Sequence, residues 1–187
     1  MSPLTPLRAP PPGRPEPPQD FSRRLEALLR LAFPLVSTAV LLILSAAPIG
    51  LPSLPFALAM PCISFWTVFR PAAMAPPIVL ALGLLLDLLT FAPLGVHVMA
   101  LLVLHGAAMR LRFLLARQSF LVVWCSFALG ALLCAALAWG FTALLLLNLP
   151  PWQPILHTLL LSAGLYPLLV LLLSRAHEAM RRAENAL

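Results

Sequence analysis

The chain has 187 residues, of which 61% are hydrophobic and only 10% are charged. Soluble domains carry about 25% charged residues, so this composition excludes an ordinary soluble domain and predicts an integral membrane protein. The formal net charge is +6, and all 12 basic residues are arginines. Nucleic-acid binding would need a folded basic domain, which the sequence does not contain.

The N-terminal segment, residues 1–19, contains eight of the 21 prolines. It cannot bury a core, so we expect a disordered cytoplasmic tail. Prolines also stand where a signal peptide would have its apolar stretch, so we do not expect a signal peptide. Residues 20–30 set apolar side chains on one helical face and arginines mostly on the other, which predicts an interfacial amphipathic helix. Alternatively, this segment extends the first membrane span.

The chain from residue 31 to residue 175 divides into apolar runs separated by turns rich in proline and glycine. A transmembrane helix needs about 20 mainly apolar residues. We therefore predict an all-α membrane domain over residues 31–175 with six transmembrane helices, followed by a basic cytoplasmic tail over residues 176–187. The predicted spans are about 31–49, 54–69, 74–91, 96–109, 119–147 and 155–174.

The arginines predict the orientation of these spans, because cytoplasmic loops are enriched in basic residues. With the N-terminus in the cytoplasm, six crossings place all 12 arginines inside, and the outer turns carry no charged residue. Both termini are then cytoplasmic, and the arginines should attract anionic lipids at that face. Trp66 and Trp124 fall toward the inner interface and Trp139 and Trp152 toward the outer one, as in an aromatic belt.

Asp87 is the only acidic residue within any predicted span. A carboxylate inside a membrane is costly unless it has a partner, so it should face the bundle. Gly83 and Thr90 share its helical face, and His97, across a short turn, is the nearest candidate partner. We favour a structural role, in which the Asp87 carboxylate anchors the hairpin through a hydrogen bond, for example to His97. There are two alternatives. Asp87 could determine partner binding or conformation, or it could relay protons or ions.

Other residues that could carry chemistry are few. His105 and His157 are predicted in opposite halves of the membrane, whereas a metal site needs three or four convergent ligands. Cys62, Cys125 and Cys134 lie in apolar runs, so we expect buried reduced thiols. Patterns for a serine nucleophile, a phosphate loop or paired carboxylates are missing. We therefore expect no catalytic residue, no metal and no cofactor.

The predicted fifth span carries a face of small residues. Ser126, Gly130, Cys134 and Ala138 recur at every fourth position. Small residues let the backbone of another helix approach closely. Packing within the bundle is the favoured interpretation, and contact with a helix of another protein is the alternative.

Several short motifs occur in a specific order. They are Arg70–Pro71 after an aromatic-rich run, the G-x-x-x-D-L-L segment Gly83–Leu89, and the P-L-G turn Pro93–Gly95. Together with a basic loop and a closing span, this order resembles the family of the bacterial rod shape-determining protein MreD over residues 31–182. Small serine or glycine residues usually follow D-L-L in that family, where this chain has Thr90, Phe91 and Ala92.

The resemblance implies a non-enzymatic scaffold of the cell-elongation machinery in the bacterial inner membrane. Proteins of this family work with MreC, a periplasmic coiled-coil protein, with the MreB filament, and with RodA and its transpeptidase in lateral peptidoglycan synthesis. The family fold is similar to the substrate-binding subunits of vitamin transporters, so a small-molecule uptake subunit is the alternative function. Candidates for structural or partner-determining roles are Arg70, Pro71, Gly83, Asp87, Thr90, Pro93, Gly95 and His97.

Overall fold

The computed structural model describes residues 21–47, 53–115 and 117–185. Within these residues the fold is all-α, with six α helices and one short 3-10 helix. The elements are α1 (Phe21–Ser45), α2 (Leu54–Phe69), η1 (Pro71–Ala73), α3 (Pro76–Thr90), α4 (Val96–Leu115), α5 (Phe120–Leu146) and α6 (Gln153–Asn185). The predicted tail, residues 1–19, lies outside the described residues.

Three of the described helices are long and apolar enough to cross a membrane, namely Val96–Leu115, Phe120–Leu146 and the Gln153–Ala179 part of α6. The apolar parts of α1, α2 and α3 are shorter. At 16 residues, α2 is about 24 Å long, whereas the hydrocarbon core of a bilayer is about 30 Å thick. Crossings by the three shorter helices therefore stay predictions.

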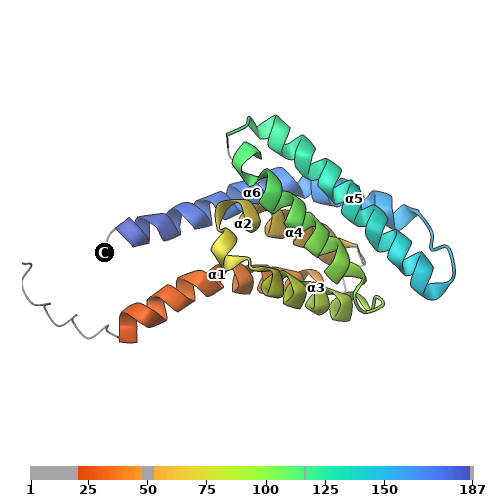
Figure 1. Ribbon diagram of the computed structural model, residues 1–187, viewed down its shortest axis with the longest axis horizontal. Coiled ribbons are helices and arrows are strands. Elements are labelled where there is room, and N and C mark those ends of the chain that lie inside the picture. The colour runs from red at the N-terminus through yellow and green to blue at the C-terminus, as the bar shows by residue number, and fades with distance from the viewer. Residues whose placement is uncertain (1–20, 48–52, 116, 186–187) are drawn as a thin grey trace, which may run out of the picture.

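Helix α2 lies at the centre of the fold and contacts each of the other described α helices (Figure 1). Every residue from Pro55 to Thr67 is buried. A helix that is apolar on all sides can be stable only when protein or lipid surrounds it, and here protein does so. Pro55 lies in the first turn of α2, where a backbone N–H would have no partner in the helix, so it fits without breaking a hydrogen bond.

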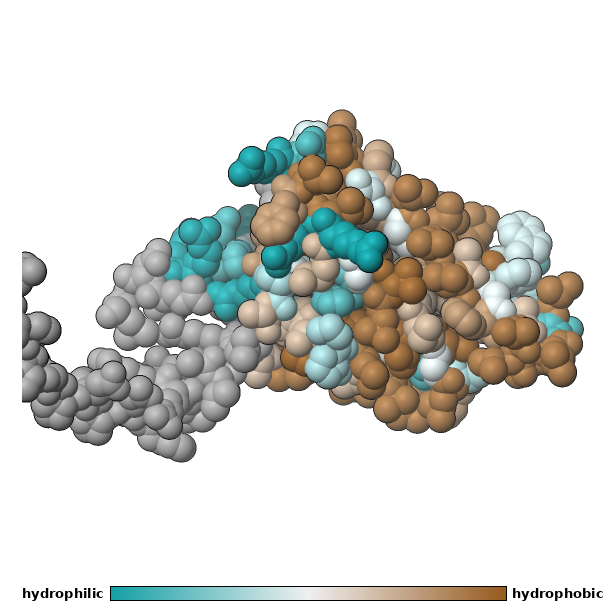
Figure 2. Space-filling view, viewed as in Figure 1, coloured by the Kyte–Doolittle hydropathy of each residue, from teal (hydrophilic) through white to brown (hydrophobic). Residues whose placement is uncertain are grey.

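Large apolar side chains are exposed on all the described α helices, and they form the broad brown area of the face that Figure 2 shows. On α5 and α6 the exposed residues include Leu121, Leu129, Leu160 and Leu168. Apolar patches of this extent are rare on soluble monomers. They are the ordinary exterior of a helix bundle that lies in lipid.

From α2 onward, the connections between the described helices alternate between two ends of the molecule (Figure 1). The link with η1, the α4–α5 link and the end of α6 lie at one end, on the left of the view, and the α3–α4 turn lies at the other. Figure 2 shows hydrophilic side chains gathered toward the left end. The arginines in these left-hand segments are Arg70, Arg110, Arg112, Arg117, Arg175, Arg181 and Arg182.

Helix boundaries differ from the predicted ones mainly at this arginine-bearing end. Helix α1 is continuous from Phe21, so the predicted interfacial segment and the first span form one helix. Helices α4 and α6 run past the predicted spans to Leu115 and Asn185, and most of the predicted tail 176–187 is therefore helical. Arginine, glutamate, alanine and methionine are good helix formers, which explains these extensions.

One prediction about a single side chain is wrong. Cys62 and Cys134 are buried as expected, but Cys125 is exposed on the outer face of α5. Trp66 is fully buried, and its ring packs edge-on against those of Phe33 and Phe65, so it faces protein and not lipid. Its depth near the inner interface stays a prediction. Hydropathy alone cannot distinguish a side chain that faces lipid from one that faces protein, because both environments are apolar.

Candidate functional site at the turn between α3 and α4

Asp87 lies in the last turn of α3, and its carbonyl oxygen ends the helix. The backbone N–H groups of Phe91 and Ala92 both donate to this oxygen, the latter at 3.1 Å. Phe91 adopts the left-handed conformation, with a φ of 52°, which is typical of the residue that follows a helix. Glycine is preferred at this position, whereas here a phenylalanine ring is 95% exposed.

The carboxylate of Asp87 reaches across the turn to the start of α4. Its Oδ2 atom accepts the backbone N–H of Gly95 at 2.7 Å, and Oδ1 accepts that of His97 at 2.9 Å. Oδ1 also lies 2.8 Å from Nδ1 of the His97 ring. The Asp87 side chain is completely buried, and that of His97 is 12% exposed. The predicted hydrogen bond between Asp87 and His97 is confirmed.

These contacts make Asp87 a cap for α4. The Gly95 carbonyl accepts the N–H of Met99 at 2.9 Å, so Gly95 is the first flanking residue of that helix. The first N–H groups of any helix lack partners within the helix. A side chain at the flanking position usually supplies the acceptor, but glycine has none. Asp87 supplies it from the neighbouring helix and places negative charge at the positive end of the α4 dipole.

Two glycines allow the hairpin to close. Gly95 has a φ of +98°, a conformation that residues with a side chain rarely adopt. Gly83 lies where α3 meets α4, and a Cβ atom there would be 2.7 Å from the Cα atom of Val98. No real Cβ contact is that short, so only glycine permits this approach of the two backbones. Both glycines belong to the segment that carries the family resemblance.

Thr90 and Phe56 complete the surroundings of the turn. The Thr90 hydroxyl donates to the Leu86 carbonyl at 2.8 Å, so it serves its own helix and does not bind the carboxylate. The Phe56 ring packs edge-on against His97, with 4.5 Å between ring centroids. This contact fixes the histidine from α2. Sequence reasoning missed it, because nothing in the pattern of α2 marks one aromatic residue above the others.

A cavity of about 300 Å³ lies beside His97, between the α3–α4 turn and the α5–α6 link. Its polar side chains include those of Thr90, His97, Thr142 and Thr158. The Trp139 indole N–H donates to the carbonyl of Pro150 at 3.0 Å and so ties α5 to this link. The cavity is of the size that small ligands occupy.

Of the remaining candidates from the family resemblance, Pro93 lies in the α3–α4 turn, where its carbonyl accepts the N–H of Val96 at 3.3 Å, whereas Arg70 and Pro71 lie elsewhere. Arg70 ends α2, with its backbone N–H donating to the carbonyl of Trp66 at 2.7 Å, and Pro71 begins η1. These two residues lie before α3, whereas Asp87 lies in its last turn. The structure therefore separates Arg70 and Pro71 from the hairpin cluster.

The small-residue face of α5 packs against α4 within the chain. The Cys134 thiol donates to the Ala100 carbonyl at 3.2 Å, and a Cβ at Gly130 would lie 3.1 Å from Cδ1 of Leu104. Ala138 is also buried. The favoured interpretation, packing within the bundle, is confirmed for these positions. Ser126, at the other end of the face, lines a separate cavity.

His105 and His157 do not lie together in a shared metal site. His105 is buried and its Nδ1 atom lies 2.9 Å from the Thr67 hydroxyl, while His157 is exposed. Among the described residues, no group of three or more His, Cys, Asp or Glu side chains is placed to hold a metal ion.

No family model, no curated protein and no solved structure matches the chain. The structure itself establishes an all-α chain whose described part has six helices, three of them able to span a membrane. Its most constrained polar feature is the carboxylate that ends α3 and caps α4.

Proposed function

We propose that the protein is a non-enzymatic scaffold of the cell-elongation machinery in the bacterial inner membrane, as the resemblance to the MreD family implies. The single observation that supports this best is the bonding of Asp87. Both oxygens of its carboxylate accept hydrogen bonds from residues of the same hairpin. The segment that carries most of the family resemblance thus fixes the conformation of the α3–α4 hairpin. A fixed surface of this kind suits a scaffold that partner proteins bind.

The same bonding argues against a proton or ion relay through Asp87. In a relay, the carboxylate exchanges protons with neighbouring polar groups or water. A relay also normally uses more than one acidic residue in the membrane. The Asp87 side chain is completely buried, and no other acidic residue occurs between residues 31 and 175. We therefore assign Asp87 as a structural anchor that also fixes the outer surface of the α3–α4 hairpin.

The proposed arrangement has six crossings with both termini in the cytoplasm. It is supported by the alternation of the connections between two ends and by the arginines that gather at one of them (Figure 1). The α3–α4 turn then faces the periplasm with Phe91 and Leu94 exposed. An MreC-like protein is the proposed partner on that side, and the MreB filament, RodA and its transpeptidase are the other proposed members of the complex.

Depletion and complementation in the host bacterium test this proposal. Depletion should round rod-shaped cells, and the wild-type protein should restore rods and copurify an MreC-like protein. Asp87→Ala, at matched membrane abundance, should restore neither shape nor copurification. Thr90→Val is the control, because the Thr90 hydroxyl bonds only within α3. Normal rods after complete depletion would overturn the proposal.

A small-molecule uptake subunit is the second candidate, and the 300 Å³ cavity beside His97 is the observation that favours it. Purified protein would then bind a vitamin saturably, and Thr142→Phe, which fills the cavity, would abolish binding. Thr142 lines the cavity and its hydroxyl bonds only the Ala138 carbonyl of its own helix. Saturable binding together with normal cell shape after depletion would select this function over the scaffold.

A further inference from the structure

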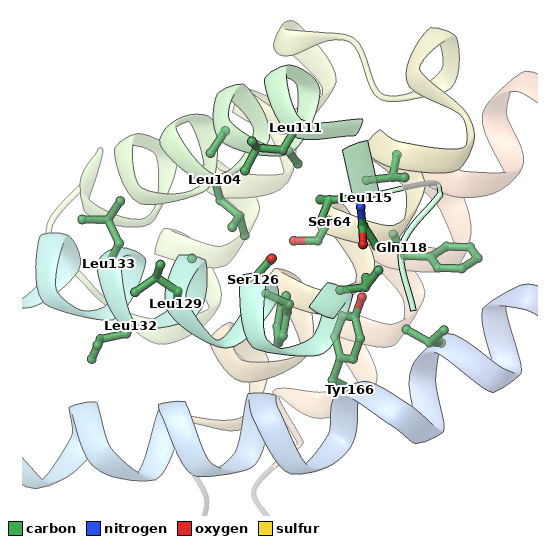
Figure 3. Close-up of a pocket in the computed structure, with 18 of the residues that line it drawn as sticks. Ser64, Leu104, Leu111, Leu115, Gln118, Ser126, Leu129, Leu132, Leu133 and Tyr166 are labelled. Atoms are coloured by element: carbon green, nitrogen blue, oxygen red, sulfur yellow. The ribbon is translucent and has the colours of Figure 1, made fainter. Parts of the chain in front are cut away.

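A larger cavity, of about 720 Å³, lies between α4 and α5 and reaches α2 and α6 (Figure 3). It is separate from the Asp87 cluster, and nothing in the proposed function uses it. Most of its wall is made of leucine, phenylalanine, valine and alanine side chains. A groove of this kind fits a largely hydrocarbon ligand.

The cavity nevertheless has a polar part and an apolar part. Figure 3 shows the polar side chains in one region of the cavity, and they are Ser64, Gln118, Ser126 and Tyr166. The purely apolar region follows α5 onward, with Leu129, Leu132 and Leu133. The order of these residues along α5 places the polar part nearer the α4–α5 link.

Ser64 is the most informative of the polar residues. It is only 9% exposed, and its hydroxyl has no hydrogen-bond partner among the described residues. Serine and threonine in a helix usually bond a carbonyl one turn earlier, as Thr38 and Ser45 do here at 2.7 Å. The Ser64 side chain instead lines the cavity (Figure 3). A buried hydroxyl without a partner is costly, so a polar atom of a ligand is expected beside it.

Three arginines lie next to lining residues in the sequence, at the end of the groove near the α4–α5 link. Arg110 and Arg112 lie in the last turns of α4, and Arg117 lies in the link to α5. Arg110 and Arg117 are exposed. No acidic residue occurs in α4, in the link or in α5. Along its length the groove therefore presents hydroxyl and amide groups and then leucines, and the arginines flank the lining residues Leu111 and Gln118 in the sequence.

We propose that this groove binds one chain of an anionic phospholipid. The phosphate lies among Arg110, Arg112 and Arg117, the ester oxygens accept hydrogen bonds from the hydroxyl groups near Ser64, and the hydrocarbon chain lies against the leucines of α5. The order of polar and apolar groups in such a lipid matches the order along the groove, and the arginines beside Leu111 and Gln118 supply the positive charge for its head group. The inference depends on membrane insertion and not on a role in cell elongation.

The size of the groove also favours a lipid chain over a helix of a partner protein. Ten residues of a helix about 10 Å wide and rising about 1.5 Å per residue fill roughly 1200 Å³. The cavity holds about 720 Å³. From Phe120 to Leu133 it extends about 20 Å at the same rise, which is comparable with one leaflet of a hydrocarbon core about 30 Å thick.

Native mass spectrometry of the full chain tests the proposal. The purified protein is exchanged into detergent with equal amounts of phosphatidylglycerol and phosphatidylcholine, and the lipid that remains bound after activation is identified. A single phosphatidylglycerol should be retained. Ser126→Phe on α5 and Ala107→Phe on α4 fill the groove from opposite walls and should each abolish retention. Cys125→Phe is the matched control, because Cys125 is exposed and lies next to Ser126.

The head-group assignment has its own variant. Replacing Arg110 and Arg117 together by glutamine should reduce the preference for phosphatidylglycerol about 30-fold, at roughly fivefold per arginine. Thermal melting of every variant in detergent verifies folding. Wild-type protein without retained lipid, equal retention in Ser126→Phe, or equal retention of both lipids would each overturn the proposal. If a second copy of this chain occupied the groove, the protein would be a dimer that Ser126→Phe and Ala107→Phe both disrupt. That outcome would also overturn the proposal.

Discussion

Helix α4 packs against α3 on one side and α5 on the other, and the two contacts differ in kind. The α3–α4 hairpin is held by a buried carboxylate that binds two backbone N–H groups and an imidazole, with Gly83 allowing close backbone contact. The α4–α5 contact has one thiol hydrogen bond, from Cys134, within an otherwise apolar interface. It also leaves a cavity at the end near the α4–α5 link.

The difference follows from where each connection can find hydrogen-bond partners. The α4–α5 link is exposed at Arg117, Gln118 and Ser119, so water can satisfy its backbone. The short α3–α4 turn is flanked by the apolar side chains of Phe91 and Leu94. Helix termini in an apolar environment need partners from the protein. Asp87 provides them, and so the buried acid lies at the turn whose backbone has fewer other partners.

The largest expected effect is the loss of the carboxylate. Asp87→Ala should lower the free energy of unfolding by about 3–5 kcal/mol, because it leaves buried donors without an acceptor. Thermal melting in detergent measures this loss. If that variant does not fold, Asp87→Asn, which keeps one acceptor oxygen, should give an intermediate loss. Cys134→Ala in the other contact should cost about 1 kcal/mol. Equal losses at the two positions would contradict the comparison.

The close approach of α3 and α4 gives the next largest effect. Gly83→Ala places a Cβ 2.7 Å from the Val98 backbone and should cost about 1–3 kcal/mol. Gly106→Ala is the matched control, because no atom lies within 4 Å of a Cβ there. Alanine in place of glycine should stabilise an open helical site by about 0.5–1 kcal/mol. The two variants should therefore shift the melting temperature in opposite directions, and shifts in the same direction would refute the backbone contact.

The pairing of Asp87 with His97 predicts a smaller coupling. His97→Phe keeps the backbone N–H and a ring against Phe56, and it removes only the imidazole hydrogen bond. A double-mutant cycle of His97→Phe with Asp87→Ala should show a coupling energy of about 1 kcal/mol. Strictly additive losses would mean that the imidazole contributes nothing to the anchor.

The smallest effect concerns the residue that ends α3. A left-handed conformation costs a residue with a side chain about 1–2 kcal/mol relative to glycine. Phe91→Gly should therefore stabilise the hairpin by up to about 1 kcal/mol, after allowance for the greater freedom of glycine in the unfolded chain. Phe113→Gly, at an exposed position within α4, should instead destabilise by about 1 kcal/mol. A loss of stability in both variants would show that the Phe91 ring itself contributes.

Sequence reasoning succeeded where a single local signal sufficed. Apolar runs and the turns between them predicted six helices, and a lone acid close to a histidine across a short turn predicted the Asp87 contact. It failed for Cys125 and did not predict that Trp66 faces protein, because the exposure of both side chains depends on how each helix is rotated. It also missed the backbone donors of Gly95 and His97, because their direction depends on the conformation of the turn. The helical extension of α6 was missed because polar residues can end a span without ending a helix.

The amino-acid sequence by itself determined that the chain suits an apolar environment and that Asp87 needs a partner. It also determined where the helices begin and end to within several residues, except for the end of α6. These properties follow from hydrophobicity, proline and glycine placement and the cost of burying charge, and all of them are local. Only the tertiary structure decided that α2 is the central helix, that Asp87 caps α4, and that a groove with Ser64 in its wall lies beside α5. Lipid-facing and protein-facing surfaces are equally apolar, so the packing alone distinguishes them.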